Sequence, residues 1–244
     1  NILIRNTIKI FKNPYNLITL MSTDIKLSHS NTPQYSSVEQ WYKSATITTR
    51  PRRILNEIKS DETLFPFSRQ PLVIHPIIID KGQAAIDYIL IQTAYRYMYE
   101  IATLETETVN SAALKIATNK HKFSFSENQC QQAMSIIVDE AYHAYVALDF
   151  IQQVKQKTSI EPVFLPKDNA VQRVLNKQKD ISPNEEHYNL LELVTVCLSE
   201  HVLTKDLVYI KKESNTCAFF NEIMQDHLVD EIRHAHYFEQ ILKF

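Results

Sequence analysis

One hexapeptide motif occurs twice in this chain, as VDEAYH at residues 138–143 and as VDEIRH at residues 229–234. In both copies a glutamate precedes a histidine by three positions, and in a helix two such residues lie on the same face. Apolar residues recur at spacings of three and four on either side of each copy, which is typical of amphipathic helices. The motif therefore predicts two long helices that each carry a glutamate and a histidine on the apolar face.

The composition of the whole chain is that of a helical protein. The 244 residues include one glycine, Gly82, and nine prolines, whereas glycine makes up about 7% of an average protein. Folds that depend on glycine turns, such as sandwiches, propellers and nucleotide-binding loops, are therefore disfavoured. No proline lies between Ile77 and Glu161 or after Asn184, which leaves long stretches free for uninterrupted helices. We expect an all-α fold.

Four long helices are expected within residues 80–244. Capping patterns place their starts after Asp80, Ser126 and Ser182. Short links make antiparallel hairpins of the first pair and of the last pair, and residues 158–181 form a crossover that is helical over Asp168–Lys179. Two hairpins joined by a crossover predict a four-helix bundle. The expected bounds are Gln83–Thr118, Glu127–Lys157, Pro183–Lys212 and Thr216–Leu242.

Residues 1–79 are expected to be an N-terminal accessory segment of the same domain, which then spans residues 1–244. A short helix is predicted over Val38–Lys59, interrupted near Pro51. The segment Phe65–Pro76 holds three prolines and is predicted to be an extended connection. The basic cluster Arg50–Arg53 is expected to be a solvated patch.

The middle of each expected apolar face is occupied by a carboxylate. These four residues are Glu105, Glu140, Glu200 and Glu231. Moving an ionised carboxylate into a protein core costs several kcal/mol, roughly, even after relaxation. No lysine or arginine stands at these central positions, so four buried carboxylates would repel one another. A pair of metal ions removes this difficulty, and iron or manganese ions accept carboxylate and imidazole ligands.

The histidines on the same faces support a site for two metals. His143 and His234 each follow a central glutamate by three positions, so that both side chains of a pair can reach one metal. His227 lies one turn before Glu231 on the same face. A histidine on an apolar face is commonly a hydrogen-bonded core residue, but the expected metal one turn away favours a ligand here.

Helix geometry separates Glu105 from the acidic residues near it in the sequence. At 100° per residue, Glu107 lies about 200° from Glu105 and Glu100 lies about 140° away on the other side. Only Glu105 is therefore expected on the buried face. Asp139 and Asp230 precede the central glutamates, and we expect each to orient the ligand histidine of the opposite helix, because metal-bound histidines commonly donate their second N–H to a carboxylate.

The net charge, the lengths of the apolar runs and the cysteine count indicate which partners and which cellular compartment to expect. A net charge of −2 gives no electrostatic reason for binding nucleic acid or an anionic membrane. No apolar run approaches the roughly 18 residues of a membrane span. The three cysteines are an odd number without a Cys-x-x-Cys spacing, so we expect reduced thiols and a cytoplasmic protein.

These motifs resemble the di-iron arylamine N-oxygenases, the family of p-aminobenzoate N-oxygenase, within the ferritin-like di-iron carboxylate proteins. The resemblance extends from about Trp41 to Phe238 and includes Phe65–Leu72. It implies a ferritin-like four-helix bundle with a di-metal site in its core. The metal ligands that it implies are Glu105, Glu140, His143, Glu200, His227, Glu231 and His234.

The resemblance also implies a substrate pocket next to the metals. Tyr97 matches the family's pocket tyrosine, and Ile101 and Thr204 are expected beside it; Thr204 stands where the family enzyme has an asparagine. The arginine with which the family enzyme binds an aromatic carboxylate follows the part that this chain matches. The resemblance therefore implies the metal chemistry more firmly than the substrate.

The function implied by the resemblance is an oxygenase with two iron ions, manganese being the alternative metal. It would use O₂ and an external electron donor to oxidise a small amine to a hydroxylamine, and further to nitroso or nitro products, through a peroxo-di-iron(III) species. A homodimer is expected. Three alternatives stay open: a di-iron hydroxylase, desaturase or radical-generating subunit acting on carbon, an iron-storage protein, and a metal-free helical interaction protein.

Overall fold

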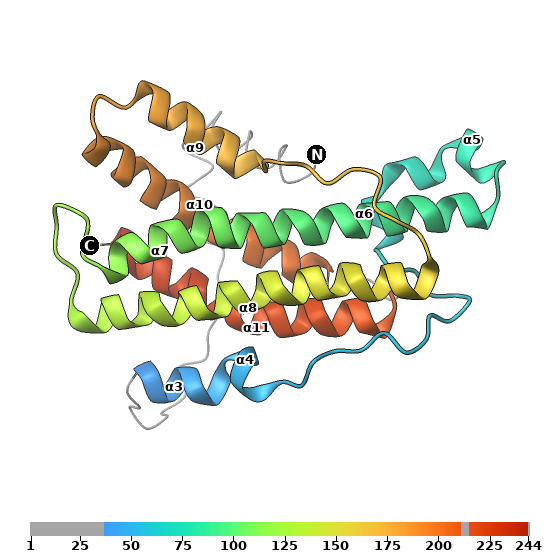
Figure 1. The fold of residues 1–244 in the computed structure, drawn as a ribbon, viewed down its shortest axis with the longest axis horizontal. Helices are drawn as coiled ribbons and strands as arrows, with labels where there is room; N and C mark the ends of the chain where they lie inside the picture. The colour runs from blue at the N-terminus through green and yellow to red at the C-terminus, as the bar shows by residue number, and fades with distance from the viewer. Residues whose placement is uncertain (1–36, 211–214, 244) are drawn as a thin grey trace. The chain divides into compact units, whose positions relative to one another are not determined.

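The computed structural model describes residues 37–210 and 215–243. All regular elements within these two ranges are helical, apart from one isolated bridge between Thr63 and Thr216 (Figure 1). The predicted all-α class is therefore confirmed. The longer helices are α6 (Gln83–Leu104), α7 (Asn110–Ala117), α8 (Glu127–Thr158), α9 (Ala170–Ile181), α10 (Glu185–Ile210) and α11 (Ala218–Leu242).

The first long helix is interrupted where the sequence predicted continuity over Gln83–Thr118. A π-helical turn, η3 (Glu105–Val109), separates α6 from α7. In a π-turn the backbone hydrogen bonds skip one residue further than in an α-helix, so the helix is locally wider. The turn begins at Glu105, the central carboxylate of this helix, and lies next to α8.

The start of α6 depends on the single glycine rather than on Asp80. Gly82 is the N-cap and has φ +84° and ψ −178°, a conformation that costs other residues roughly 1–3 kcal/mol. Asp80 instead follows the short helix α5 (Pro76–Ile79) and closes it with backbone hydrogen bonds. The predicted Asp80 cap is therefore wrong, because a tight link between two helices required a positive φ.

The starts of the other helices are correct to within two residues. The capping box of Ser126 and Gln129 is present at α8. Ser182 does not cap α10, because it closes α9; Asn184 accepts the His187 N–H at 2.9 Å instead. The expected end of this helix, Lys212, lies outside the described residues.

The long helices pack as two hairpins. Helices α6 and α7 lie along α8, and α10 lies along α11, while α8 also contacts α11 and α7 contacts α10 (Figure 1). Residues 159–184, which include α9, connect the hairpins, as expected for a crossover. The predicted four-helix bundle is therefore confirmed. None of the described helices is both long and apolar enough to cross a membrane.

The accessory segment is less helical than predicted over Val38–Lys59. It forms α3 (Ser37–Ser44) and the one-turn helix α4 (Thr46–Thr49), after which the chain is extended. This extended part is fastened to α8, where Gln153 accepts the Leu55 N–H at 2.8 Å. In this extended part, backbone groups form hydrogen bonds with side chains of α8 instead of the backbone hydrogen bonds that a longer helix would have.

The proline-rich segment is more ordered than an extended connection. It contains two 3₁₀ turns, η1 (Phe67–Arg69) and η2 (Pro71–Ile74), since proline fits the first position of a helical turn. The part of the accessory segment before residue 37 lies outside the described residues, so the expected single domain over 1–244 stays a prediction.

Candidate metal centre

Four glutamates and three histidines meet in the core of the bundle. They form two groups whose ligand atoms lie within 4.8 Å of one another, and Glu231 belongs to both. We refer to the first as the histidine-rich group and to the second as the acidic group. The histidine-rich group comprises Glu105, His143, His227 and Glu231, and the acidic group comprises Glu140, Glu200, Glu231 and His234.

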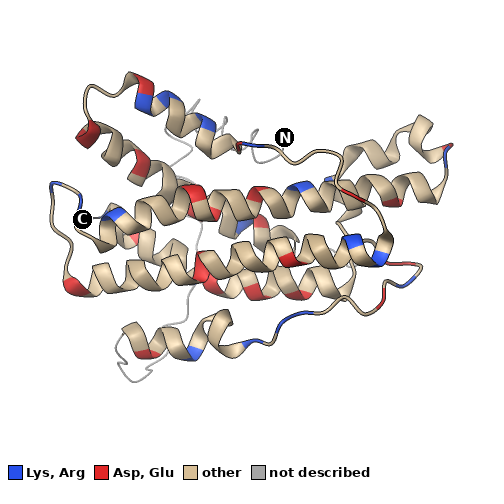
Figure 2. Ribbon diagram, in the orientation of Figure 1, with Lys and Arg blue, Asp and Glu red and all other residues tan. Residues whose placement is uncertain are grey.

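All four helices of the bundle supply this centre from their middles. Figure 2 shows acidic residues in the middle of α8, away from the helix ends. Glu105 comes from the π-turn, Glu140 and His143 from α8, Glu200 from α10, and the remaining ligands from α11. The four glutamates and His234 have no exposed surface, and His143 and His227 are 5% exposed.

In the histidine-rich group the donor atoms converge on one point. The His227 Nε2 atom lies 2.8 Å from Glu105 Oε1 and 3.3 Å from Glu231 Oε1. The rings of His143 and His227 have centroids 4.3 Å apart. The His143 Nδ1 atom lies 3.5 Å from the same Glu231 oxygen. These side chains come from three different helices, so the cluster is a product of the bundle.

The acidic group has a similar arrangement around a single histidine. The His234 Nδ1 atom lies 3.0 Å from Glu140 Oε1 and 3.2 Å from Glu231 Oε1. The other Glu140 oxygen, Oε2, lies 3.3 Å from His143 Nδ1. Glu140 and Glu231 therefore each face both groups, which is the position of a carboxylate that bridges two metals.

The buried carboxylates lack the partners that a metal-free core would need. Both carboxylate oxygens of Glu105, Glu200 and Glu231 are buried without a hydrogen bond. The His227 Nε2 and His234 Nδ1 atoms are likewise without one, despite their short distances to carboxylates. Buried charges without partners cost several kcal/mol each, roughly. Oxygen and nitrogen donors in this number fit two ions such as iron or manganese.

The pKa values of these glutamates also indicate that their charges are unfavourable in the metal-free core. Burial raises the pKa of Glu200 well above its usual value, and the charges of Glu231 and Glu140 raise it further. Burial also raises the pKa of Glu105 to about 7, although His227 opposes this shift. For Glu231, burial is outweighed by His234 and His227, which hold its pKa well below the usual value. Protons thus occupy places that cations would take.

Each motif aspartate lies beside the histidine of the opposite helix. Asp230 Oδ2 is 2.9 Å from His143 Nε2, and Asp139 Oδ2 is 3.2 Å from His234 Nε2. A carboxylate at Nε2 favours a proton on that nitrogen and leaves Nδ1 as the acceptor. In both histidines Nδ1 faces the glutamates, so Nδ1 is the atom available to a metal.

Three further residues hold these aspartates, and none of them is among the site residues predicted from the sequence. The Nη2 atom of Arg233 lies 2.6 Å from Asp139 Oδ2 and 2.9 Å from Asp230 Oδ1, so one guanidinium joins both pairs. Trp41 of α3 donates to Asp139 at 2.9 Å, and Thr46 of α4 donates to Asp230 at 2.5 Å. Arg233 belongs to the motif itself, but no spacing linked Trp41 or Thr46 to it.

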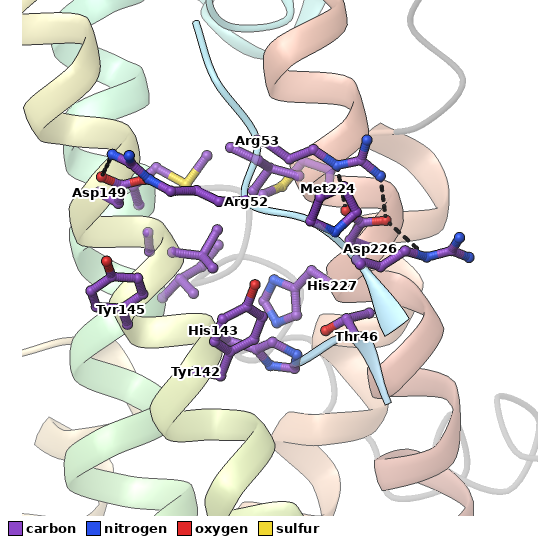
Figure 3. Close-up of a pocket in the computed structure, with 17 residues that line it drawn as sticks. Thr46, Arg52, Arg53, Tyr142, His143, Tyr145, Asp149, Met224, Asp226 and His227 are labelled. Carbon is purple, nitrogen blue, oxygen red and sulfur yellow. Dashed lines mark hydrogen bonds and ion pairs between the residues drawn. The ribbon is translucent and has the colours of Figure 1, made fainter. Parts of the chain in front are cut away.

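A cavity of about 190 Å³ reaches the histidine-rich group between α6, α8 and α11 (Figure 3). His143 and His227 line it, and so does Ile101, as expected for the substrate pocket. Arg50–Arg53 lines it too. As expected, this segment is largely exposed to solvent, but Arg52 and Arg53 also pair with Asp149 and Asp226 at the cavity.

The two other residues expected at the substrate pocket do not line this cavity. The Tyr97 hydroxyl lies 3.3 Å from Asp206 Oδ2, and the other oxygen of Asp206, Oδ1, pairs with Arg69. The Thr204 hydroxyl donates to the backbone carbonyls of Glu200 at 2.8 Å and Glu231 at 3.2 Å. Thr204 thus ties two ligand-bearing helices together.

Comparison with known proteins assigns the chain to a family. The sequence model of the family described as p-aminobenzoate N-oxygenase AurF matches residues 57–244. No curated protein matches the chain. The matched part covers the ligand-bearing helices, and the family consists of ferritin-like di-iron oxygenases that act on arylamines. The protein is therefore a member of the p-aminobenzoate N-oxygenase AurF family, with the di-iron oxygenase function of that family.

Proposed function

We propose that this protein N-oxygenates a small arylamine at an iron pair held by the two ligand groups. The observation that carries the proposal is the shared Glu231, which joins a histidine-rich group at the end of a cavity to an acidic group behind it. Two iron ions bound there would supply the reduction of O₂. In the balanced reaction an amine, O₂, two electrons and two protons give a hydroxylamine and water.

The chain's own residues prepare this site in three ways. Asp139 and Asp230 hold the Nδ1 atoms of two histidines toward the centre. The buried position of the glutamates excludes water from the centre, which strengthens their interaction with cations. The cavity connects to the histidine-rich group along partly apolar walls that include Met98 and Ile223.

The test combines metal analysis with isotope labelling. We expect two iron ions per chain after anaerobic loading with Fe(II). On admission of ¹⁸O₂ together with an arylamine and a chemical reductant, mass spectrometry should show one labelled oxygen on nitrogen. Label on carbon would favour the hydroxylase alternative, and manganese uptake in preference to iron would change the metal. Stopped-flow absorption after O₂ mixing tests the oxygen-derived intermediate expected from the sequence.

A homodimer, a dedicated electron donor, a cytoplasmic location and oxidation beyond the hydroxylamine belong to the same proposal. Sedimentation of the metal-loaded protein tests the dimer. Product analysis over time tests whether nitroso or nitro compounds follow the hydroxylamine.

A further inference from the structure

The cavity next to the histidine-rich group has an unusual roof. The segment Arg50–Arg53, which we call the strap, lies over the cavity between α8 and α11, with His143 and His227 at the inner end (Figure 3). The strap precedes residues 57–244, the part that matches the family. The family match therefore does not cover the roof of the cavity.

Two ion pairs fasten the strap on opposite sides. Arg52 binds Asp149 of α8 through Nε at 2.9 Å and Nη2 at 2.7 Å. Arg53 binds Asp226 of α11 through Nε at 2.7 Å and Nη2 at 3.0 Å. Both contacts are two-pronged, the geometry in which arginine pairs are strongest, and Figure 3 shows them on either side of the cavity.

The positive charges at this roof are balanced by acidic neighbours. Arg53 also contacts Glu222 at 3.1 Å, and Arg50 lies 3.6 Å from Asp226. Three arginines thus face three carboxylates. Among the described residues that line the cavity, no lysine and no further arginine is present. The cavity therefore offers no uncompensated charge of either sign to a ligand at its roof.

The walls below the roof are largely apolar. Met98, Ile101, Val146 and Ile223 line the cavity between the strap and the two histidines. The volume of about 190 Å³ exceeds the roughly 150 Å³ of an apolar cavity that takes up benzene. A single substituted aromatic ring therefore fits. A charged group on that ring would be desolvated along these apolar walls, and the partly exposed arginines of the roof already have carboxylate partners, so its binding is unfavourable.

We propose that this cavity binds an uncharged aromatic amine, and that the Arg52–Asp149 pair sets this preference by occupying the cation that a substrate carboxylate would otherwise use. The proposal rests on the proposed function only in calling the ligand a substrate. The ring lies between the apolar walls, and its amino group points to the inner end, toward His143 and His227. An arylamine with a carboxylate, or an alkylamine that is protonated near neutral pH, is disfavoured.

The first experiment compares three ligands of similar size on the iron-loaded protein without O₂. The probes are 4-methylaniline, which is uncharged, 4-aminobenzoate, which is an anion, and benzylamine, which is a cation near neutral pH. Calorimetric titration should show that 4-methylaniline binds at least about tenfold more tightly than either charged probe, as expected when a charge is desolvated without a partner. Equal or tighter binding of 4-aminobenzoate, or no binding of 4-methylaniline, would overturn the proposal.

The second experiment frees the arginine. In Asp149→Asn the shape of the side chain is kept while Arg52 loses its charged partner, so 4-aminobenzoate should bind about three- to tenfold more tightly. The affinity for 4-methylaniline should stay unchanged. The matched control is Glu222→Gln, which changes the net charge by the same amount near the strap but does not line the cavity. An equal gain in the control would show a long-range charge effect and would contradict the role of the Arg52–Asp149 pair.

The third experiment fills the cavity. Val146→Phe places a ring in it and should weaken 4-methylaniline binding at least about tenfold, whereas Leu148→Phe on the exposed side of α8 should not. Unchanged affinity in Val146→Phe, in a variant that keeps its two irons, would place the binding site elsewhere. These titrations do not depend on turnover. If the enzyme is active but Val146→Phe binds 4-methylaniline as before, only the assignment of the binding site to this cavity is refuted. If the probes bind selectively but no oxygenated product forms, only the proposed function is refuted.

Discussion

The two ligand groups of the metal centre share Glu231 but differ in their other donors. The histidine-rich group adds two imidazoles and one carboxylate, whereas the acidic group adds one imidazole and two carboxylates. His143 and His227 of the histidine-rich group also line the cavity. If the protein acts as proposed, the less anionic histidine-rich group would contact the small molecule in the cavity. The acidic group would then bind the second metal.

The strain in the metal-free protein is also unequal between the two groups. Both carboxylates lack a hydrogen bond, but the His227 Nε2 atom lies 2.8 Å from Glu105 Oε1, whereas Glu200 is not in ion-pair contact with any described histidine, lysine or arginine. The pKa of Glu200 is accordingly raised well above its usual value by burial and by neighbouring carboxylates. The acidic group therefore depends more strongly on a bound cation than the histidine-rich group does.

The largest effect is expected from removal of Glu231, the ligand that both groups share. In Glu231→Ala we expect the iron content to fall from two per chain to nearly none, because both groups lose a donor. Elemental analysis after anaerobic loading measures this. The control is Glu107→Ala, an exposed residue two positions from Glu105, which should keep both irons. Retention of one tightly bound iron in Glu231→Ala would contradict the shared position of Glu231.

The next largest effect is expected from a substitution that removes a ligand of one group only, such as Glu200 of the acidic group. Glu200→Gln should lose about one iron per chain, and in metal-free form it should unfold at a higher temperature than the unaltered protein. The gain is expected because the metal-free protein no longer has to bury a charge or take up a proton at this position on folding. Calorimetry and elemental analysis measure both properties.

The matched variant on the other side is His227→Gln. It should also lose about one iron, but without a gain in stability of the metal-free protein, since His227 partners Glu105 there. Equal stability of the two metal-free variants would show that the groups are not unequally strained.

Disturbing the aspartates should weaken both groups without removing a ligand. Asp230→Asn leaves His143 in place but loses the carboxylate at its Nε2, so iron affinity should fall about 10- to 100-fold.

Arg233→Gln should lower the affinity for both irons together, because Arg233 contacts Asp139 and Asp230 at once. Competition with a chelator measures these affinities. The control Glu239→Gln lies on the exposed side of α11, and an equal loss there would rule out a local effect.

The smallest effect concerns the pH dependence of the metal-free protein. Glu105 has a pKa of about 7, raised by burial, and His227 has one of about 9, raised against burial by Glu105 and Glu231. Both exceed the values of an unfolded chain, so the native state binds more protons. The resulting stabilisation is present at low pH and is lost as the pH rises through the native pKa. The unfolding temperature should therefore fall between about pH 5 and pH 9.

The iron-loaded protein should show a much weaker dependence, because metal ions replace these protons. Glu105→Gln, which cannot ionise, should lose less stability than the unaltered protein over the same range when both are metal-free. Thermal melts at several pH values measure the effect. A rise in stability with pH in the metal-free protein would contradict the assigned shifts.

Much of the bundle could be predicted from local patterns. The capping box at Ser126 and the glycine-free and proline-free stretches place helices within two residues of their observed starts. The motifs at 138–143 and 229–234 bring their glutamates and histidines to one face by helix periodicity alone. The choice of Glu105 over Glu107 also agrees with the burial of Glu105 and the exposure of Glu107.

Other features depend on contacts between distant segments and have no local signature. The π-turn at Glu105 follows a continuous apolar pattern, and the sequence indicates no interruption there. The exposure of the strap agrees with its charged sequence, but no local pattern indicates its partners Asp149 and Asp226, which stand far away in the chain. Trp41 and Thr46 reach the aspartates for the same reason.

The sequence by itself determined the helical class, the positions of the long helices and the seven residues with metal-binding chemistry, because helix periodicity and the cost of buried charge act over a few residues. Only the tertiary structure decided that Glu231 belongs to both groups, that Arg233 joins the two aspartates, and that the strap covers a cavity at the histidine-rich group. Those relations depend on the angle and register at which helices pack, which many weak contacts set together.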